Sequence, residues 1–164
     1  MDDNDIILQS SERLISEAKK LNIIISTAES CTGGMLASFL TSIPGSSAVF
    51  DRGFITYSNS SKIDLLNVNP NTIDNFGAVS DKTAREMALG AVKNSKANLA
   101  ASITGVAGPE GGTKVNPVGT VHIATSNSNN IINSRKFIIK DKGRDYIRKM
   151  ASLEAINMLS LSIS

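Results

Sequence analysis

The sequence contains one cysteine, one histidine and no tryptophan among its 164 residues. A single cysteine excludes an internal disulfide and fits a reducing cytoplasm. One histidine and one cysteine, without the short spacings of metal-binding motifs, argue against a zinc site, so we expect neither a metal nor a cofactor. Aromatic residues make up only 4% of the chain, which argues against a surface that stacks nucleic-acid bases.

The charge balance and the apolar runs indicate neither a nucleic-acid partner nor a membrane. The 17 basic and 15 acidic residues leave a net charge of +2, too balanced for a polyanion as the main partner. No run approaches the roughly 18 apolar residues of a membrane span, and the acidic start, MDDNDIILQSSE, lacks the apolar centre of a signal peptide. The length and the 41% hydrophobic content predict a single domain over residues 1–164.

Apolar periodicity predicts helices and strands that alternate along the chain. Helices are expected at residues 5–20 and 34–43, from an N-cap at Ser58 or Asn59, between Pro70 and Gly77, from an N-cap at Ser80, and over about the last 20 residues. Strands are expected at residues 22–26, 48–57, 99–105, 120–125 and 131–140, the last two joined as a hairpin. In the second of these strands, Gly53 indicates a bulge or a close backbone approach. This order predicts a three-layer α/β/α sandwich with a mixed, mostly parallel sheet.

The segment TAESCTGG, residues 27–34, places three nucleophilic side chains between a strand and a helix: Ser30, Cys31 and Thr32. Backbone N–H groups at the start of a helix can hold an oxyanion, and the two glycines allow a substrate to approach the backbone. The alternative is that Ser30 or Thr32 merely caps the helix. The segment is not a G-x-S-x-G nucleophile elbow.

Two residues are candidate bases. His122 lies between apolar neighbours in the strand TVHIAT, which is typical of a structural histidine. Lys62 falls in the first turn of a helix, where the helix dipole disfavours a second positive charge and lowers a lysine pKa. Tyr57 precedes it closely, but the S-x-x-K motif is absent, because Asn59 stands three residues before Lys62. The alternative is an ordinary surface lysine.

A glycine-rich loop, GVAGPEGGTKVNPVG, follows the strand at residues 99–105. It lacks the spacing of a phosphate-binding P-loop but offers many backbone N–H groups. The alternative is a flexible surface loop, since 15 or so residues is long for a compact domain. Three segments, TAESCTGG, TYSNSSK and TGVAGPEGG, follow strands, and ligands in open α/β sheets bind beyond the carboxyl ends of strands.

These motifs resemble the C-terminal domain of the competence-damage-inducible protein A family. The resemblance runs from about Ser10 to about Leu161 and includes AESCTGG, the run G-x-x-x-Y-S-N-x-x-K, GAVS and G-x-A-G-P-x-G-G. That domain also occurs as a free-standing nicotinamide-nucleotide amidase. The chain begins directly with this domain, so we expect no N-terminal nucleotide-processing domain of the kind found in the longer family members.

The resemblance implies a reaction, a site and a location. The reaction is hydrolysis of the carboxamide of nicotinamide mononucleotide to nicotinate mononucleotide and ammonia, in cytoplasmic pyridine nucleotide salvage. Ser30 matches the family's nucleophile, Lys62 its general base, and Tyr57 a nearby tyrosine that orients one of them. Substrate-binding residues are then expected in the two glycine-rich segments: Cys31, Thr32, Gly33, Gly34, Thr104, Gly105, Ala107, Gly108 and Gly112.

The resemblance also implies a homo-oligomer. The alternative function is a non-enzymatic nucleotide-binding or interaction module in competence or DNA-damage responses. Tight nucleotide binding without release of ammonia would distinguish that module from the amidase.

Overall fold

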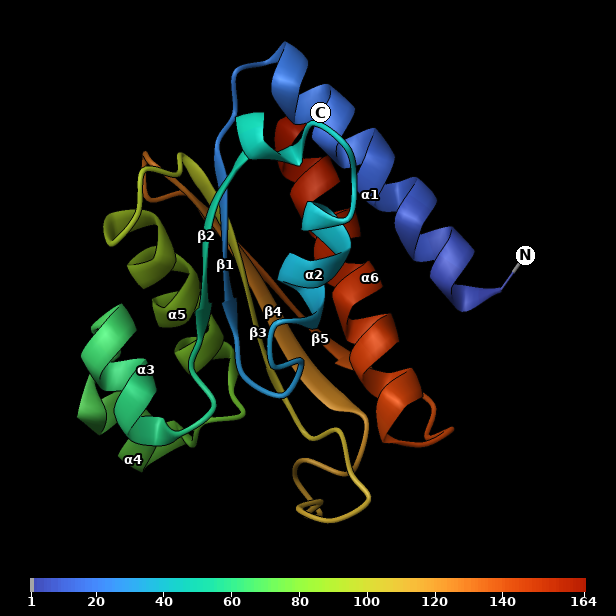
Figure 1. The fold of residues 1–164 in the computed structure, drawn as a ribbon. Helices are drawn as coiled ribbons and strands as arrows, with labels where there is room; N and C mark the ends of the chain where they lie inside the picture. Colours follow the sequence, from blue (N-terminus) through green and yellow to red (C-terminus); the bar gives the residue numbers. More distant parts are fainter. Residues whose placement is uncertain (1) are drawn as a thin grey trace.

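The computed structural model describes residues 2–164, which form a five-stranded mixed sheet between two layers of helices (Figure 1). The strands are β1 (Ile25–Glu29), β2 (Phe50–Ile55), β3 (Leu99–Gly105), β4 (Thr120–Asn127) and β5 (Ile132–Ile138). The helices are α1 (Asp3–Lys20), α2 (Met35–Thr41), α3 (Asn59–Leu66), α4 (Pro70–Phe76), α5 (Asp81–Lys93) and α6 (Arg144–Ile163), with a 3-10 turn at Ser46–Ala48. The expected three-layer α/β/α architecture is confirmed.

The strand order β2-β1-β3-β4-β5 places β1 in the middle of three parallel strands. β4 runs antiparallel to both β3 and β5, so four of the five strands point the same way and the sheet is mixed, as predicted. Parallel strands bring their carboxyl ends to one edge. The segments that follow β1, β2 and β3 therefore meet at the same edge of the sheet.

The two faces of the sheet are covered by different helices (Figure 1). α1, α2 and α6 pack together on one face, and α5 covers the other, with α3 and α4 packed against α5. The larger apolar cluster lies on the side of α1, α2 and α6, and a smaller one, which includes Leu66 and Met87, lies under α5. Within residues 2–164, no helix is both long and apolar enough to cross a bilayer.

β1 occupies Ile25–Glu29 instead of the predicted residues 22–26. Asn22 has a φ of 53°, and the chain is still turning out of α1 there, with Ile23 N–H donating to the Ala18 carbonyl. The strand then continues through Thr27 and Glu29, both buried. A polar residue in a fully buried strand is stable when its hydrogen bonds are satisfied, and Glu29 finds its partners in α2. The predicted strand ended too early, at residue 26, because the polar residues that follow were not expected inside a buried strand.

β2 is shorter than predicted, and its bulge lies two residues before Gly53. Ile25 pairs with Phe50 and Ser26 with Arg52, so Asp51 is the extra residue. Gly53 instead marks a close approach, because a Cβ there would lie 2.9 Å from Thr27 Oγ1. The approaching atom belongs to a side chain, so Gly53 makes room for Thr27 and not for another backbone.

The predicted caps of two helices are confirmed. The side chains of Ser58 and Ser80 accept hydrogen bonds from the first turns of α3 and α5. α1 begins earlier than predicted, because Asp2 and Asp5 form a reciprocal capping box. The hairpin of β4 and β5 is also present, with β4 extending through Asn127.

Gly90 allows α5 to pack against the end of α3, the helix that carries Lys62. A Cβ at Gly90 would lie 2.0 Å from the Leu66 carbonyl oxygen. Gly90→Ala should destabilise the fold although alanine has the better helix propensity by about 1 kcal/mol, because overpacking against a fixed backbone costs about 1–3 kcal/mol or more. We expect thermal denaturation to show a Tm lower by several degrees.

The matched control is Lys93→Ala, an exposed position on the same helix. This variant should leave the Tm nearly unchanged. A Gly90→Ala protein as stable as the parent would show that α3 and α5 are not in contact at this point.

Candidate active site

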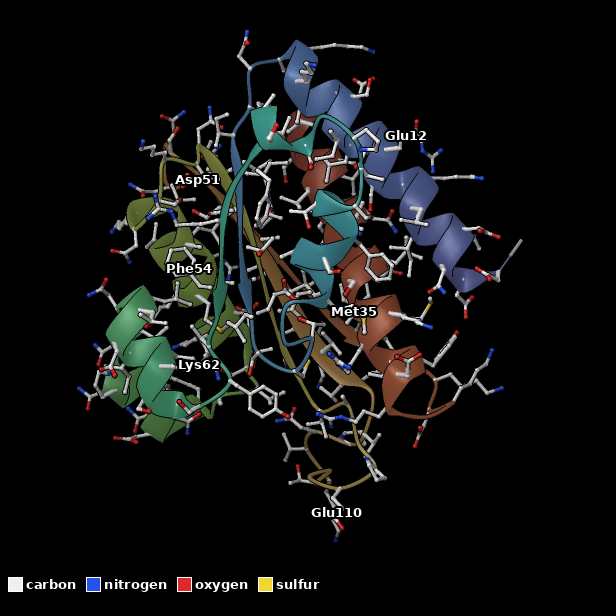
Figure 2. The ribbon with its side chains drawn as sticks, viewed as in Figure 1. Glu12, Met35, Asp51, Phe54, Lys62 and Glu110 are labelled. Atoms are coloured by element: carbon white, nitrogen blue, oxygen red, sulfur yellow. The ribbon has the colours of Figure 1, made fainter. Side chains whose placement is uncertain are left out.

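Ser30 and Lys62 meet at the carboxyl edge of the sheet. Ser30 follows directly after β1, and side chains alternate between the faces of a strand, so Glu29 points toward α2 and Ser30 toward α3. Lys62 extends from the start of α3 (Figure 2), and its Nζ lies 3.1 Å from Ser30 Oγ. Ser30 is 9% exposed and Lys62 only 1%. The alternative of a surface lysine is therefore wrong.

The Lys62 amine is surrounded by hydrogen-bond acceptors without a carboxylate. Its Nζ lies 2.8 Å from the Thr56 carbonyl oxygen, 3.4 Å from that of Tyr57 and 3.5 Å from that of Ser58. None of the ion pairs formed within residues 2–164 includes Lys62. Burial lowers the pKa of Lys62, and the thiol of Cys31 acts weakly in the opposite direction. Burial therefore shifts the amine toward its neutral form, which can accept a proton.

Glu29, which precedes Ser30, caps α2 from inside the protein. Its buried carboxylate accepts hydrogen bonds from the backbone N–H groups of Gly34, Leu36 and Ala37, at 3.1, 3.0 and 2.9 Å. The N-cap residue itself is Gly34, so the alternative in which Ser30 or Thr32 caps this helix is wrong. A carboxylate at the positive end of a helix is favourable. The Glu29 carboxylate therefore occupies the N-terminal end of α2.

This internal cap limits which N–H groups near the start of α2 can hold an oxyanion. The N–H of Gly34 donates to Glu29, and the N–H of Gly33 donates to the Ser30 carbonyl at 3.0 Å. Both glycines have positive φ values, 57° and 97°, so the turn itself requires them. Of the four N–H groups from Cys31 to Gly34, those of Cys31 and Thr32 make no such hydrogen bond within residues 2–164.

A cleft of about 310 Å³ opens in front of Ser30 and Lys62. Eight residues expected at the site line it: Ser30, Cys31, Tyr57, Lys62, Thr104, Gly105, Ala107 and Gly108. Four others do not line it: Thr32, Gly33, Gly34 and Gly112. A Cβ at Gly112 would lie 3.0 Å from the backbone nitrogen of Val118, so this glycine permits the loop to pack on itself.

The comparison with protein families identifies the family to which the chain belongs. The family model for the CinA C-terminal domain matches residues 8–163. The chain belongs to the CinA C-terminal domain family. It is 46% identical over 139 residues to a putative competence-damage inducible protein of Caldicellulosiruptor saccharolyticus, covering 85% of this chain and 33% of that protein. The chain thus spans about a third of the length of that relative.

Two other relatives match this CinA domain over nearly their whole length. The nicotinamide-nucleotide amidohydrolase PncC of Escherichia coli K12 is 42% identical, covering 93% of this chain and 92% of that protein. The crystal structure of the competence/damage inducible protein CihA from Agrobacterium tumefaciens is 46% identical, with a TM-score of 0.93, covering 96% of this chain and 95% of the other.

In this CinA domain, Tyr57 and Arg144 join the loops around the cleft. Arg144 Nη2 donates to the Tyr57 hydroxyl at 2.8 Å, and Nη1 donates to the Gly108 carbonyl at 2.7 Å. The Tyr57 hydroxyl therefore has Arg144 as its partner, while only the Tyr57 backbone carbonyl contacts Lys62. Sequence reasoning missed Arg144, which is distant in the chain. Its one local signal is a positive charge at the first position of α6, where the helix dipole disfavours it.

The glycine-rich loop is tied down at several points. Besides the contact of Gly108 with Arg144, the side chain of Asn116 donates to the Val79 carbonyl at 3.1 Å. At the base of the loop, Thr104 Oγ1 donates to the Ala78 carbonyl at 2.7 Å. These bonds join the loop to the GAVS segment, and they argue against the alternative of a loose surface loop. Glu110 lies on this loop (Figure 2) and lines the cleft.

Cys31 and His122 are poor candidates for the chemistry. Burial raises the pKa of the Cys31 thiol to about 11, so the thiol stays protonated at neutral pH. His122 pairs across the sheet with Thr104 and Lys136 and does not line the cleft. Burial and the charge of Lys136 lower the pKa of His122. Within residues 2–164, no cluster of three or more His, Cys, Asp or Glu side chains is arranged to hold a metal ion.

Proposed function

We propose that this CinA domain hydrolyses the carboxamide of nicotinamide mononucleotide to nicotinate mononucleotide and ammonia, with Ser30 as nucleophile and Lys62 as general base. The observation that carries the proposal is the distance of 3.1 Å between Ser30 Oγ and Lys62 Nζ, buried at the floor of a cleft. Relatives named nicotinamide-nucleotide amidohydrolase, which match nearly the whole chain, support the substrate class.

The surroundings of Lys62 suit a neutral amine, which has two N–H bonds and one lone pair. One N–H donates to the Thr56 carbonyl at 2.8 Å, and the other has the carbonyls of Tyr57 and Ser58 within reach. The lone pair then faces Ser30 and accepts the hydroxyl proton as Oγ attacks the amide carbon. A tetrahedral oxyanion forms, and Lys62 becomes an ammonium.

The next steps return the site to its starting state. The Lys62 ammonium gives its proton to the amide nitrogen, the C–N bond breaks, and ammonia leaves an ester on Ser30. A water molecule then gives its proton to Lys62 and attacks the ester carbon. The second tetrahedral intermediate collapses, Ser30 Oγ regains a proton from Lys62, and nicotinate mononucleotide leaves. One water is consumed and one ammonia released.

The cleft offers distinct surroundings for the two ends of the substrate. The pyridinium carries a positive charge, which makes its carboxamide electron-poor and favours a neutral Lys62. Arg144, on the cleft wall, supplies the positive charge that suits the nucleotide phosphate. The glycine-rich loop after β3 lets the nucleotide approach its backbone.

The direct test is to incubate the purified protein with nicotinamide mononucleotide and to assay ammonia and nicotinate mononucleotide. We expect equal amounts of the two products. Nicotinamide riboside, which lacks the phosphate, tests the role assigned to Arg144 and should be cleaved less efficiently. Tight binding of the nucleotide without ammonia would favour the binding-module alternative.

Assembly into a homo-oligomer stays a prediction from the resemblance, which size-exclusion chromatography with light scattering can test.

Removal of divalent metals should leave this activity intact. Every proton transfer in the mechanism is assigned to Ser30, Lys62 or water, so no step needs a Lewis acid. We expect the same kcat/KM before and after exhaustive dialysis against EDTA. Activity that is lost with EDTA and recovered with a divalent ion would contradict the Ser–Lys mechanism.

A further inference from the structure

Arg148 of α6 holds the two peptide groups that follow the nucleophile. Its Nε donates to the Cys31 carbonyl at 3.2 Å, and its Nη2 donates to the Thr32 carbonyl at 2.8 Å. None of the ion pairs within residues 2–164 includes Arg148, so this guanidinium serves two neutral carbonyls. Arg148 is partly buried, and its rigid fork matches two neighbouring acceptors in a way that a lysine cannot.

This contact fixes the direction of an N–H group. In a trans peptide the C=O and the N–H point in opposite directions. Because the Cys31 carbonyl points toward Arg148, the Thr32 N–H of the same peptide points away from Arg148. In the same way, the Ser30 carbonyl turns toward the Gly33 N–H, and the Cys31 N–H of that peptide points away from Gly33.

The neighbouring N–H groups donate to oxygen acceptors within the described part of the chain, and these two do not. Ser30 N–H donates to the Ile103 carbonyl, Gly33 N–H to the Ser30 carbonyl, and Gly34 N–H to Glu29. The N–H groups of Cys31 and Thr32 donate to no backbone or side-chain oxygen of residues 2–164. Free N–H groups directly after a nucleophile are the usual donors to the oxyanion of a tetrahedral intermediate.

We propose that Arg148 is a positioning residue, which holds the turn after Ser30 so that the Cys31 N–H faces the cleft as an oxyanion donor, while Glu29 anchors the other end of the same turn. This inference rests on the proposed amidase function. Arg148 takes the carbonyls of the turn and Glu29 takes the N–H groups of Gly34, Leu36 and Ala37, so the turn is held from both sides.

Arg148 also acts on the turn through its charge. A guanidinium bound to a carbonyl polarises that peptide, and its N–H becomes a stronger donor. The positive charges of Arg144 and Arg148 also oppose the rise in the pKa of the Cys31 thiol. A positive field thus reaches the turn on which the oxyanion would form.

The test compares Arg148→Lys and Arg148→Met with Lys149→Gln, which removes a positive charge from the next position of α6. Loss of a whole oxyanion donor costs about 10²–10³ in kcat, and these variants would only loosen the donor. We therefore expect kcat on nicotinamide mononucleotide to fall about 10- to 100-fold, with Arg148→Met the worse variant and KM within twofold of the parent. Lys149→Gln should keep the parental kcat.

Measurements well below the Tm of each variant separate positioning from stability. A merely structural arginine would lower the Tm and leave the kcat of the folded protein unchanged, and that result would overturn the inference. A rise in KM with unchanged kcat would overturn it as well, because it would make Arg148 a substrate contact.

A fluorophosphonate probe separates this inference from the proposed substrate. The probe forms a tetrahedral adduct on an activated serine and needs no nucleotide. If the parent protein releases no ammonia, the proposed function fails, and the labelling rate of Ser30 then decides the inference. Slower labelling of Arg148→Lys than of Lys149→Gln would support it. Equal rates, or no labelling of Ser30 in the parent, would overturn it.

Discussion

Replacing Ser30 by alanine should abolish the release of ammonia, while replacing Cys31 by alanine should reduce it severalfold at most. Of the three neighbouring nucleophilic side chains, Ser30 is the one whose oxygen lies 3.1 Å from Lys62 Nζ. Loss of a nucleophile costs about four to six orders of magnitude in kcat. The Cys31 thiol is buried and protonated, and its removal leaves the backbone N–H in place.

The measurement is kcat on nicotinamide mononucleotide for both variants, with circular dichroism to show that each is folded. Ser30 is buried, but its side chain is small, so Ser30→Ala should keep the parental Tm to within a few degrees. An active Ser30→Ala protein together with an inactive Cys31→Ala protein would make the thiol the nucleophile. The raised pKa of that thiol argues against this outcome.

The sequence pattern predicts the architecture well because its helices and strands differ in period and are separated by clear caps. Ser58, Ser80 and Pro70 each start a helix where the local rules place them. The predicted bounds of a strand are wrong where tertiary contacts lower the free-energy cost of burying a polar residue. Glu29 is the clearest case, because this glutamate is buried in a strand and three backbone N–H groups at the start of α2 satisfy its carboxylate.

The site was predictable in part. Local spacing offers Ser30 and Lys62 only as candidates beside plausible structural alternatives, and the resemblance to a family was needed to select them. Their contact is a property of the sheet order, which places β1 beside β2 and brings the segments after both strands to one edge. Arg144 and Arg148 could not be predicted from spacing, because α6 reaches this edge only in the folded protein.

Replacing Lys62 by arginine should be nearly as damaging as replacing it by alanine. Arginine stays protonated in proteins and cannot accept the serine proton, although it keeps the positive charge. We expect both variants to lose about two to four orders of magnitude in kcat, since general-base catalysis contributes about 10²–10⁴-fold. If Lys62→Arg kept a near-parental kcat and changed only KM, Lys62 would be an electrostatic contact with the substrate.

The pH dependence of the parent protein tests the same residue without a mutation. Burial disfavours the ammonium and lowers the pKa of Lys62, and its place in the first turn of α3 acts in the same direction. The base is inactive when protonated, so kcat/KM should be low in acid and rise with pH through the lowered pKa to a plateau. We expect a single ionisation well below the pKa of about 10.4 of a free lysine. A profile that rises only near that value would mean that Lys62 is charged in the working enzyme, and the proton of Ser30 would then need another acceptor.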